Sequence, residues 1–110
     1  MTPTQTIPTV TDEGFPAAVL ESDLPVLVDF TAAWCPPCRV MKPVLAELAA
    51  ERADLRVVQL DIDAHQRTAA EYSVLAMPTF IVFRGGQEVG RLVGARPKRR
   101  LEGELAELLG

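Results

Sequence analysis

The chain has few of the residues that usually hold metal ions. Its 110 residues contain two cysteines and a single histidine, His65. A structural zinc site needs four ligands, usually a second Cys pair or two His beside the first pair. The composition therefore argues against zinc, and the two cysteines need another explanation.

Long apolar runs and an excess of positive charge are also absent. No apolar segment approaches the ~18 residues of a membrane span, so a soluble protein is expected, with no membrane partner. The net charge is -4, whereas nucleic-acid binding needs a positive field that displaces counterions, so nucleic acid is not an expected partner. Residues 1–8 lack the basic region and the apolar core of a secretory signal, which predicts a cytoplasmic location.

The length predicts a single domain over residues 1–110, because a chain of this size buries roughly two-thirds of its unfolded surface in one core. Residues 1–8 are rich in Thr and Pro and are predicted to be a loose lead-in. One basic cluster, formed by Arg96, Lys98, Arg99 and Arg100, is interpreted as a solvated helix face.

The two cysteines, Cys35 and Cys38, stand where a strand pattern gives way to a helix pattern. A disulfide that closes so small a ring contributes about 2 kcal/mol, against about 4.7 kcal/mol for a hundred-residue loop. The spacing therefore favours a redox pair over a structural bridge. A helix N-terminus stabilises a thiolate, so Cys35 is predicted to attack and Cys38, one turn inside the helix, to resolve the mixed disulfide.

An acidic residue interrupts the strongest strand signal. The run Val26–Phe30 is almost continuously apolar, which is typical of a strand covered on both faces, yet it contains Asp29. Burial disfavours the charged form of a carboxyl and raises its pKa. Asp29 is interpreted as a buried acid-base group beneath the cysteines; the alternative is a surface residue on a half-exposed strand.

The remaining periodicities predict alternating strands and helices, and hence an α/β fold. Strand, helix and strand in succession imply parallel pairing, and Gly85-Gly86 implies an antiparallel hairpin, so the sheet is predicted to be mixed. His65 falls in a polar helix and is expected to be solvated, without a role. The predicted elements are an edge strand near 7–10, helices over 11–22, 38–52, 64–73 and from 97, and strands over 26–30, 55–62, 79–83 and 88–93.

Four motifs in order resemble the thioredoxin family, from about Val10 to the C-terminus. They are Val28-Asp29-Phe30, Ala33-Trp34-Cys35-Pro36-Pro37-Cys38, Met77-Pro78-Thr79 and Val93-Gly94-Ala95. The resemblance implies a thioredoxin fold, with a central mixed five-stranded sheet flanked by four helices. It also implies that Asp29 takes the proton of Cys38, and that Pro78 is cis. The substrate-binding surface that it implies consists of Trp34, Met77, Pro78, Gly94 and Ala95.

The resemblance implies a cytoplasmic, monomeric protein-disulfide reductase and general electron donor. Its expected partners are a flavoprotein thioredoxin reductase that draws on NADPH, and disulfide-containing proteins such as reductases and peroxidases. No cofactor is expected on the chain itself. The alternatives are a disulfide oxidase or isomerase, and a redox-inert module that binds proteins with the same apolar surface.

Three positions near the site depart from the family pattern and bear on the redox potential. Gln59 stands where the family usually has a lysine, and Thr31 follows Asp-Phe in place of a tryptophan. Pro36 stands where glycine is the commonest residue in the family. Without the lysine, the pKa of Asp29 is expected to be raised by desolvation. Redox tuning is assigned to Pro36, Pro37 and Gln59.

Overall fold

The computed structural model describes residues 7–110, which form a four-stranded sheet flanked by helical segments. In the sheet order β2-β1-β3-β4, β1 is parallel to β2 and antiparallel to β3, and β3 is antiparallel to β4. The mixed sheet and the C-terminal hairpin are thus confirmed. The strands are β1 (Val26–Thr31), β2 (Arg56–Asp61), β3 (Thr79–Arg84) and β4 (Gln87–Val93).

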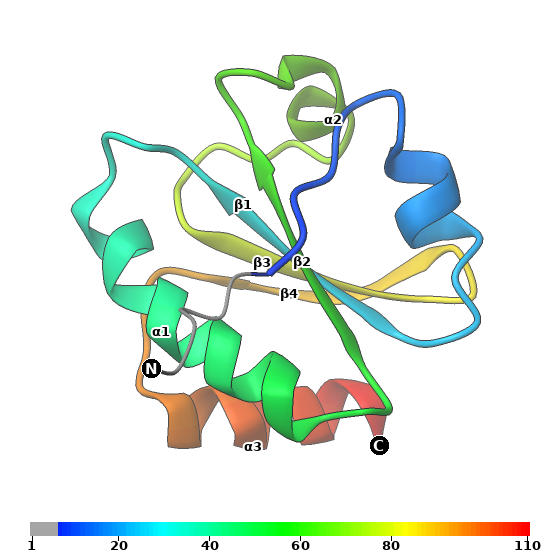
Figure 1. The fold of residues 1–110 in the computed structure, drawn as a ribbon, viewed down its shortest axis with the longest axis vertical. Helices are drawn as coiled ribbons and strands as arrows, with labels where there is room; N and C mark the ends of the chain where they lie inside the picture. Colours follow the sequence, from blue (N-terminus) through cyan, green and yellow to red (C-terminus); the bar gives the residue numbers. More distant parts are fainter. Residues whose placement is uncertain (1–6) are drawn as a thin grey trace, which may run out of the picture.

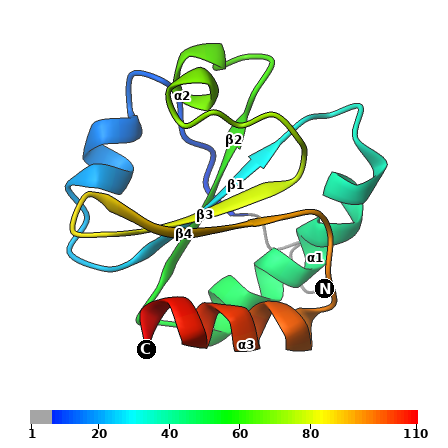
Figure 2. The same cartoon turned by 180° about the vertical axis from the view of Figure 1, so that it is seen from behind.

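Helices cover both faces of this sheet. In Figures 1 and 2, α1 and α3 lie on one side of the sheet, and α2 and the short helix η1 lie on the other. The parallel pairing of β1 with β2 needs a crossover, which α1 supplies. Among the described residues, no helix has the length and apolar character to cross a membrane. The helical segments are η1 (Pro16–Leu20), α1 (Pro36–Glu51), α2 (Gln66–Glu71) and α3 (Lys98–Leu109).

The expected fifth strand is reduced to one bridge, between Thr9 and Gln59. The Val10 N–H donates to the Gln59 carbonyl at 2.8 Å, and the Gln59 N–H donates to the Pro8 carbonyl at 2.9 Å. Pro8 has no N–H, so the ladder cannot continue through it. Ile7 is buried in the core, so the packed structure begins inside the segment expected to be loose; residues 1–6 of that segment lie outside the described residues.

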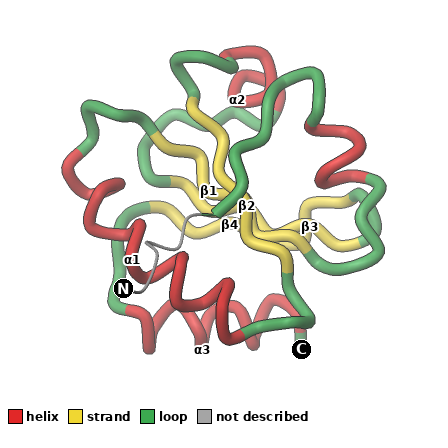
Figure 3. The backbone as a smooth tube through the Cα atoms, viewed as in Figure 1, coloured by secondary structure: helices red, strands yellow, loops and turns green. Residues whose placement is uncertain are grey.

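The first predicted helix is much shorter than expected and is a π-helix, Pro16–Leu20. The N-cap residue of this helix is Phe15, and the Thr11 hydroxyl instead accepts the Gly14 N–H at 2.9 Å in the turn before the helix. Pro16 then lacks the N–H that an α-helix over 11–22 would use at that position. Figure 3 accordingly shows only a short helical piece between the N-terminal loop and β1.

Strand β1 is buried along its whole length and separates two apolar layers. Leu27 packs with Leu45 in the layer under α1 and α3, whereas Phe30 packs in the layer under η1 and α2. Successive side chains of a strand point to opposite faces, so Asp29 faces the same side as Leu27. The buried acid therefore lies beneath the helix that carries the cysteines.

His65 is not the solvated residue that the sequence suggested. It is half-buried, and its Nδ1 accepts the Asp12 N–H at 3.1 Å. The Asp12 carboxylate accepts the N–H groups of Thr68 at 2.9 Å and Arg67 at 3.3 Å, and the hydrogen bonding from Thr68 lowers the pKa of Asp12. Asp12 and His65 thus join the N-terminal segment to the start of α2.

Arg96 also differs from the solvated helix face expected for the basic cluster. It is 8% exposed, and its guanidinium donates to the Val93 carbonyl at 2.6 Å and the Gly94 carbonyl at 3.2 Å. Its Nη1 contacts both carboxylate oxygens of Glu104 at 2.7 Å. Lys98 pairs with two acids of α1. The cluster therefore ties α3 to α1 and to the end of β4.

Replacing Arg96 should test this network. We expect Arg96→Leu to lower the free energy of unfolding by about 2 kcal/mol, because two carbonyls lose a charged donor and a partly buried carboxylate loses its partner. Urea denaturation measures the loss. The control is Arg99→Leu, which removes the same charge from an exposed position of α3 and should change stability little. Equal losses in both variants would contradict the assignment.

Candidate active site

The two cysteines are joined in a disulfide at the start of α1, with their Cα atoms 5.3 Å apart. Cys35 is the N-cap residue and Cys38 lies in the first turn, as predicted. Cys35 is 3% exposed and Cys38 is 0% exposed. The burial order is the one expected for an attacking and a resolving thiol, although Cys35 itself is also largely covered in the disulfide form.

Backbone donors are scarce around the Cys35 sulfur. Pro36 and Pro37 are exposed and have no N–H, so the nearest donor on the following residues is the Cys38 N–H, which reaches Cys35 Sγ at 3.3 Å. A helix N-terminus usually presents several free N–H groups to an anion. This one retains a single hydrogen bond to the sulfur.

Segments from other parts of the fold surround the disulfide. Met77 packs against the small cluster that contains both cysteines, and the Met77-Pro78 peptide bond is cis, as expected. The Gly94 N–H donates to the Pro78 carbonyl at 2.8 Å, and Gly94 has a φ of 96°. That positive φ favours glycine. Ala95 follows in the same loop and is exposed.

Trp34 is 61% exposed beside the cysteines, and its indole is anchored. Its Nε1–H donates to Asp63 Oδ2 at 2.8 Å. Asp63 was not identified from the sequence, because the contact joins residues 29 positions apart. The only local signal was an acidic residue just beyond the end of β2. The hydrogen bond restricts the indole at the edge of the site.

Asp29 is completely buried, and neither carboxylate oxygen has a hydrogen-bond partner among the described residues. Desolvation raises the pKa of Asp29 to about 7, and the positive charge of Lys42 opposes the rise. The direction of the shift agrees with the expectation. The strand lysine of the family is absent, as the sequence shows, but Lys42 of α1 supplies a positive charge that partly opposes the effect of desolvation.

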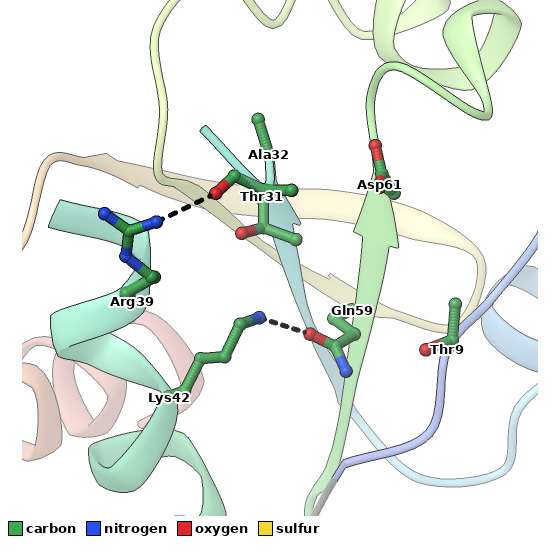
Figure 4. Close-up of a pocket in the computed structure, with 8 residues that line it drawn as sticks. Thr9, Thr31, Ala32, Arg39, Lys42, Gln59 and Asp61 are labelled. Atoms are coloured by element: carbon green, nitrogen blue, oxygen red, sulfur yellow. Dashed lines mark hydrogen bonds between the residues drawn. The ribbon is translucent and has the colours of Figure 1, made fainter. Parts of the chain in front are cut away.

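Lys42 reaches across to β2, where its Nζ donates to Gln59 Oε1 at 2.8 Å (Figure 4). Thr31, which stands in place of a tryptophan, has a buried hydroxyl without a hydrogen-bond partner among the described residues. Thr31, Lys42 and Gln59 all line a cavity of about 370 Å³. Its lining residues are Thr9, Thr31, Ala32, Ala33, Arg39, Lys42, Gln59 and Asp61.

The arrangement of the disulfide and the buried acid defines a class of protein. A small-ring disulfide at a helix N-terminus can open to a pair of thiols, one at the surface edge and one inside. A buried carboxyl with a pKa near neutrality lies under the same helix. These are the parts of a protein that exchanges its disulfide with the thiols and disulfides of other molecules.

Known proteins identify the family. The family model described as thioredoxin matches residues 6–107. The thioredoxin of Mycobacterium tuberculosis (strain ATCC 25618 / H37Rv) is 50% identical over 101 residues, which cover 91% of this chain and 87% of that protein. The thioredoxin of Alicyclobacillus acidocaldarius is 46% identical over 102 residues, covering 92% and 96%. A bifunctional thioredoxin reductase/thioredoxin of Mycobacterium leprae is 48% identical over 101 residues, 22% of its length.

The chain belongs to the thioredoxin family. It is a protein-disulfide reductase that works by thiol-disulfide exchange at the Cys35–Cys38 pair.

The buried acid predicts an unusual dependence of stability on pH. The pKa of Asp29 is raised from 3.8 to about 7 in the folded protein, so the folded state binds this proton more tightly than the unfolded state. The contribution of this bound proton to the free energy of unfolding is complete below about pH 4 and is lost as the pH rises through about 7. The full loss is on the order of 4 kcal/mol.

We therefore expect Asp29→Asn to gain stability relative to the native chain as the pH increases. Urea denaturation of the native chain and of Asp29→Asn, each in its disulfide form, between about pH 4 and pH 8 measures the difference in unfolding free energy. All other titrating groups are common to the two proteins. A constant difference in unfolding free energy across this range would mean that Asp29 titrates at an ordinary carboxyl pKa.

Proposed function

We propose that Cys35 is the attacking thiolate and Cys38 the resolving thiol. Cys35 attacks one sulfur of a substrate disulfide, forms a mixed disulfide and releases the other substrate sulfur as a thiolate. Cys38 then loses its proton and attacks Cys35, which forms the intramolecular disulfide and releases the second substrate sulfur. Two electrons pass to the substrate, and both released thiolates take protons from water or from the protein.

The position of each sulfur carries this proposal. Cys35 is the N-cap residue and therefore lies at the outer end of α1, where an incoming disulfide meets it first. Cys38 is fully buried one turn later, so Cys35 is the more accessible of the two residues. The thiolate of Cys35 is favoured by the helix N-terminus and by the Cys38 N–H.

We assign Asp29 as the base that receives the Cys38 proton. A pKa of about 7 leaves a large fraction of this carboxyl ionised at neutral pH and still basic enough to accept a proton. Its oxygens are not held by other groups among the described residues, so they are available. In the disulfide form neither sulfur carries a proton that Asp29 could accept.

The substrate surface that we propose consists of Trp34, Met77, Pro78, Gly94 and Ala95. Met77 contacts the cysteine cluster, and the Gly94 to Pro78 hydrogen bond brings two of its loops together. The exposed Trp34 adds apolar area at the same end of α1. Disulfide-containing proteins, reductases and peroxidases among them, are the proposed substrates.

We further propose that a flavoprotein thioredoxin reductase, supplied by NADPH, returns the disulfide to the dithiol. The Mycobacterium leprae relative, whose name joins both activities in one chain, supports this pairing. In this proposal the protein acts in the cytoplasm, as a monomer with a single domain over 1–110 and no cofactor of its own. The family match over 6–107 supports the single domain.

The prolines favour a reductase over an oxidase. A less stabilised thiolate makes the reduced form less stable, so the disulfide is more readily formed and the protein is a better electron donor. Pro36 and Pro37 remove two N–H donors that would have stabilised the Cys35 thiolate. The third candidate, a redox-inert binding module, predicts no reduction of insulin disulfides by the protein with dithiothreitol.

The order of attack can be tested by trapping. We expect Cys38→Ser to accumulate mixed disulfides with substrate proteins, because the first attack remains and the resolving thiol is gone. Cys35→Ser should neither reduce insulin nor form mixed disulfides. Non-reducing electrophoresis measures the trapped species. Accumulation in Cys35→Ser instead of Cys38→Ser would reverse the two roles.

Pro36→Gly tests the redox tuning. It restores one N–H next to the sulfur, and a hydrogen bond to a charged acceptor is worth about 1.5 to 3 kcal/mol when well aligned. We expect a lower pKa for Cys35 and a modestly more oxidising potential, measured by thiolate absorbance and by equilibration with glutathione. An unchanged or raised pKa would mean that proline acts through backbone stiffness only.

A further inference from the structure

Lys42 and Gln59 lie where they can act on the buried acid. Asp29 and Gln59 are register partners on the parallel strands β1 and β2, so their side chains emerge on the same face of the sheet. Lys42 lies four residues after Cys38 on α1, and residues four apart share one side of a helix. The lysine thus comes from the helix above the acid, and the glutamine from the strand beside it.

Both ends of the Gln59 amide are engaged. Oε1 accepts from Lys42 Nζ at 2.8 Å, and Nε2 donates to the Ile7 carbonyl at 3.2 Å. Since the carbonyl of residue 7 can only accept, the amide is oriented with its oxygen toward the lysine. Figure 4 shows the lysine extended from α1 toward β2 at the edge of the cavity. Gln59 therefore holds the ammonium group in one place.

Two other charged side chains that line the same cavity are engaged elsewhere. On α1, Arg39 donates to the Ala33 carbonyl at 3.2 Å. At the end of β2, Asp61 accepts the N–H groups of Asp63 and Ala64 at 2.8 and 3.3 Å.

On α3, Arg96 is paired with Glu104, and β3 has only uncharged side chains between Thr79 and Phe83. Of all these groups, Lys42 is the one whose charge lowers the pKa of Asp29.

We propose that Lys42, held over β2 by Gln59, is the positioning residue that keeps Asp29 able to ionise when Cys38 has to lose its proton. The proposal rests on the base role given to Asp29 above. An Asp29 carboxylate accepts the Cys38 proton, Cys38 attacks Cys35, and the carboxylic acid then returns its proton to water. Removing the cation makes the carboxylate less stable, so a smaller fraction of Asp29 is ready to accept a proton at a given pH.

The first experiment titrates Asp29 in the disulfide form by carbon NMR of its carboxyl group. Neither cysteine titrates in that form, so the curve belongs to Asp29 alone and is not coupled to the thiols. Lys42→Met should raise the midpoint by about 0.2 to 0.7 of a pH unit, the range expected for one exposed charge. Added salt should raise the midpoint of the native chain and have less effect in Lys42→Met.

The matched control is Arg56→Met, which removes the same charge from an exposed residue of β2. Arg56 is three positions from Gln59, so its side chain leaves the opposite face of the sheet. It should leave the Asp29 midpoint unchanged. Equal midpoints in Lys42→Met and Arg56→Met would overturn the proposal.

Moving the cation supplies a rescue. The double variant Lys42→Met/Gln59→Lys transfers the charge from the helix to the register partner of Asp29. Its midpoint should return to that of the native chain or fall below it. A midpoint that stays as high as in Lys42→Met would show that charge near Asp29 is not the controlling factor.

The kinetic readout is the rate at which a preformed mixed disulfide on Cys35 is resolved. Lys42→Met should slow this step about 1.6- to 5-fold below the Asp29 midpoint, the fold-change that a shift of about 0.2 to 0.7 of a pH unit gives, and little above it. Asp29→Asn should slow it most above the midpoint, where the native carboxyl is ionised. An unchanged rate in Asp29→Asn would overturn the base role, and an unchanged Asp29 titration in Lys42→Met would overturn the role of Lys42. The two failures are thus seen in different measurements.

Discussion

The burial of a carboxyl group inside an apolar layer is the constraint on which the site depends. Asp29 shares one face of β1 with Leu27, in a strand that is covered on both faces, and no described residue hydrogen-bonds to its oxygens. An apolar side chain there would pack without the cost of desolvating a charge. The acid is therefore kept at the expense of stability near neutral pH, which is typical of a group that serves chemistry and not packing.

Helix α1 joins this acid to the surface. The crossover between two parallel strands places the helix start at the carboxyl end of β1, and the loop from Thr31 to Cys35 is only a few residues long. Cys35 and Cys38 are therefore fixed relative to the strand below them by the same packing that forms the core. A shift of α1 would move the disulfide and Lys42 together, so the sulfur chemistry and the charge near Asp29 share one rigid support.

Most of the fold could be predicted from local patterns because the core strands carry them clearly. The predicted strand 79–83 ends one residue short of β3, and 26–30 one residue short of β1. The missing strand and the shortened first helix are both caused by prolines, Pro8 and Pro16, which have no N–H to donate. A hydrophobic pattern does not reveal the loss of a backbone donor.

The contacts that could not be predicted join residues far apart in the sequence. Lys42 is one of two basic residues in α1, with Arg39, and nothing local indicates that it reaches Gln59. Arg96 belongs to a cluster of basic residues that resembles an ordinary solvated face, yet its guanidinium is buried. The cysteine pair and Asp29 can be identified from the sequence because their residue types are unusual at those positions. The contacts of Lys42 and Arg96 join different elements of the fold, so only the structure shows them.

The prolines at the start of α1 also change how the protein meets small anions. Pro36 and Pro37 have no N–H, the Cys38 N–H is directed to Cys35 Sγ, and the Arg39 N–H donates to the Cys35 carbonyl at 3.2 Å. Residues 36–39 therefore leave no backbone donor free at this helix end, where phosphate or carboxylate groups would otherwise collect. A phosphate or carboxylate group beside the sulfur consequently finds no free backbone N–H among residues 36–39 to bind it.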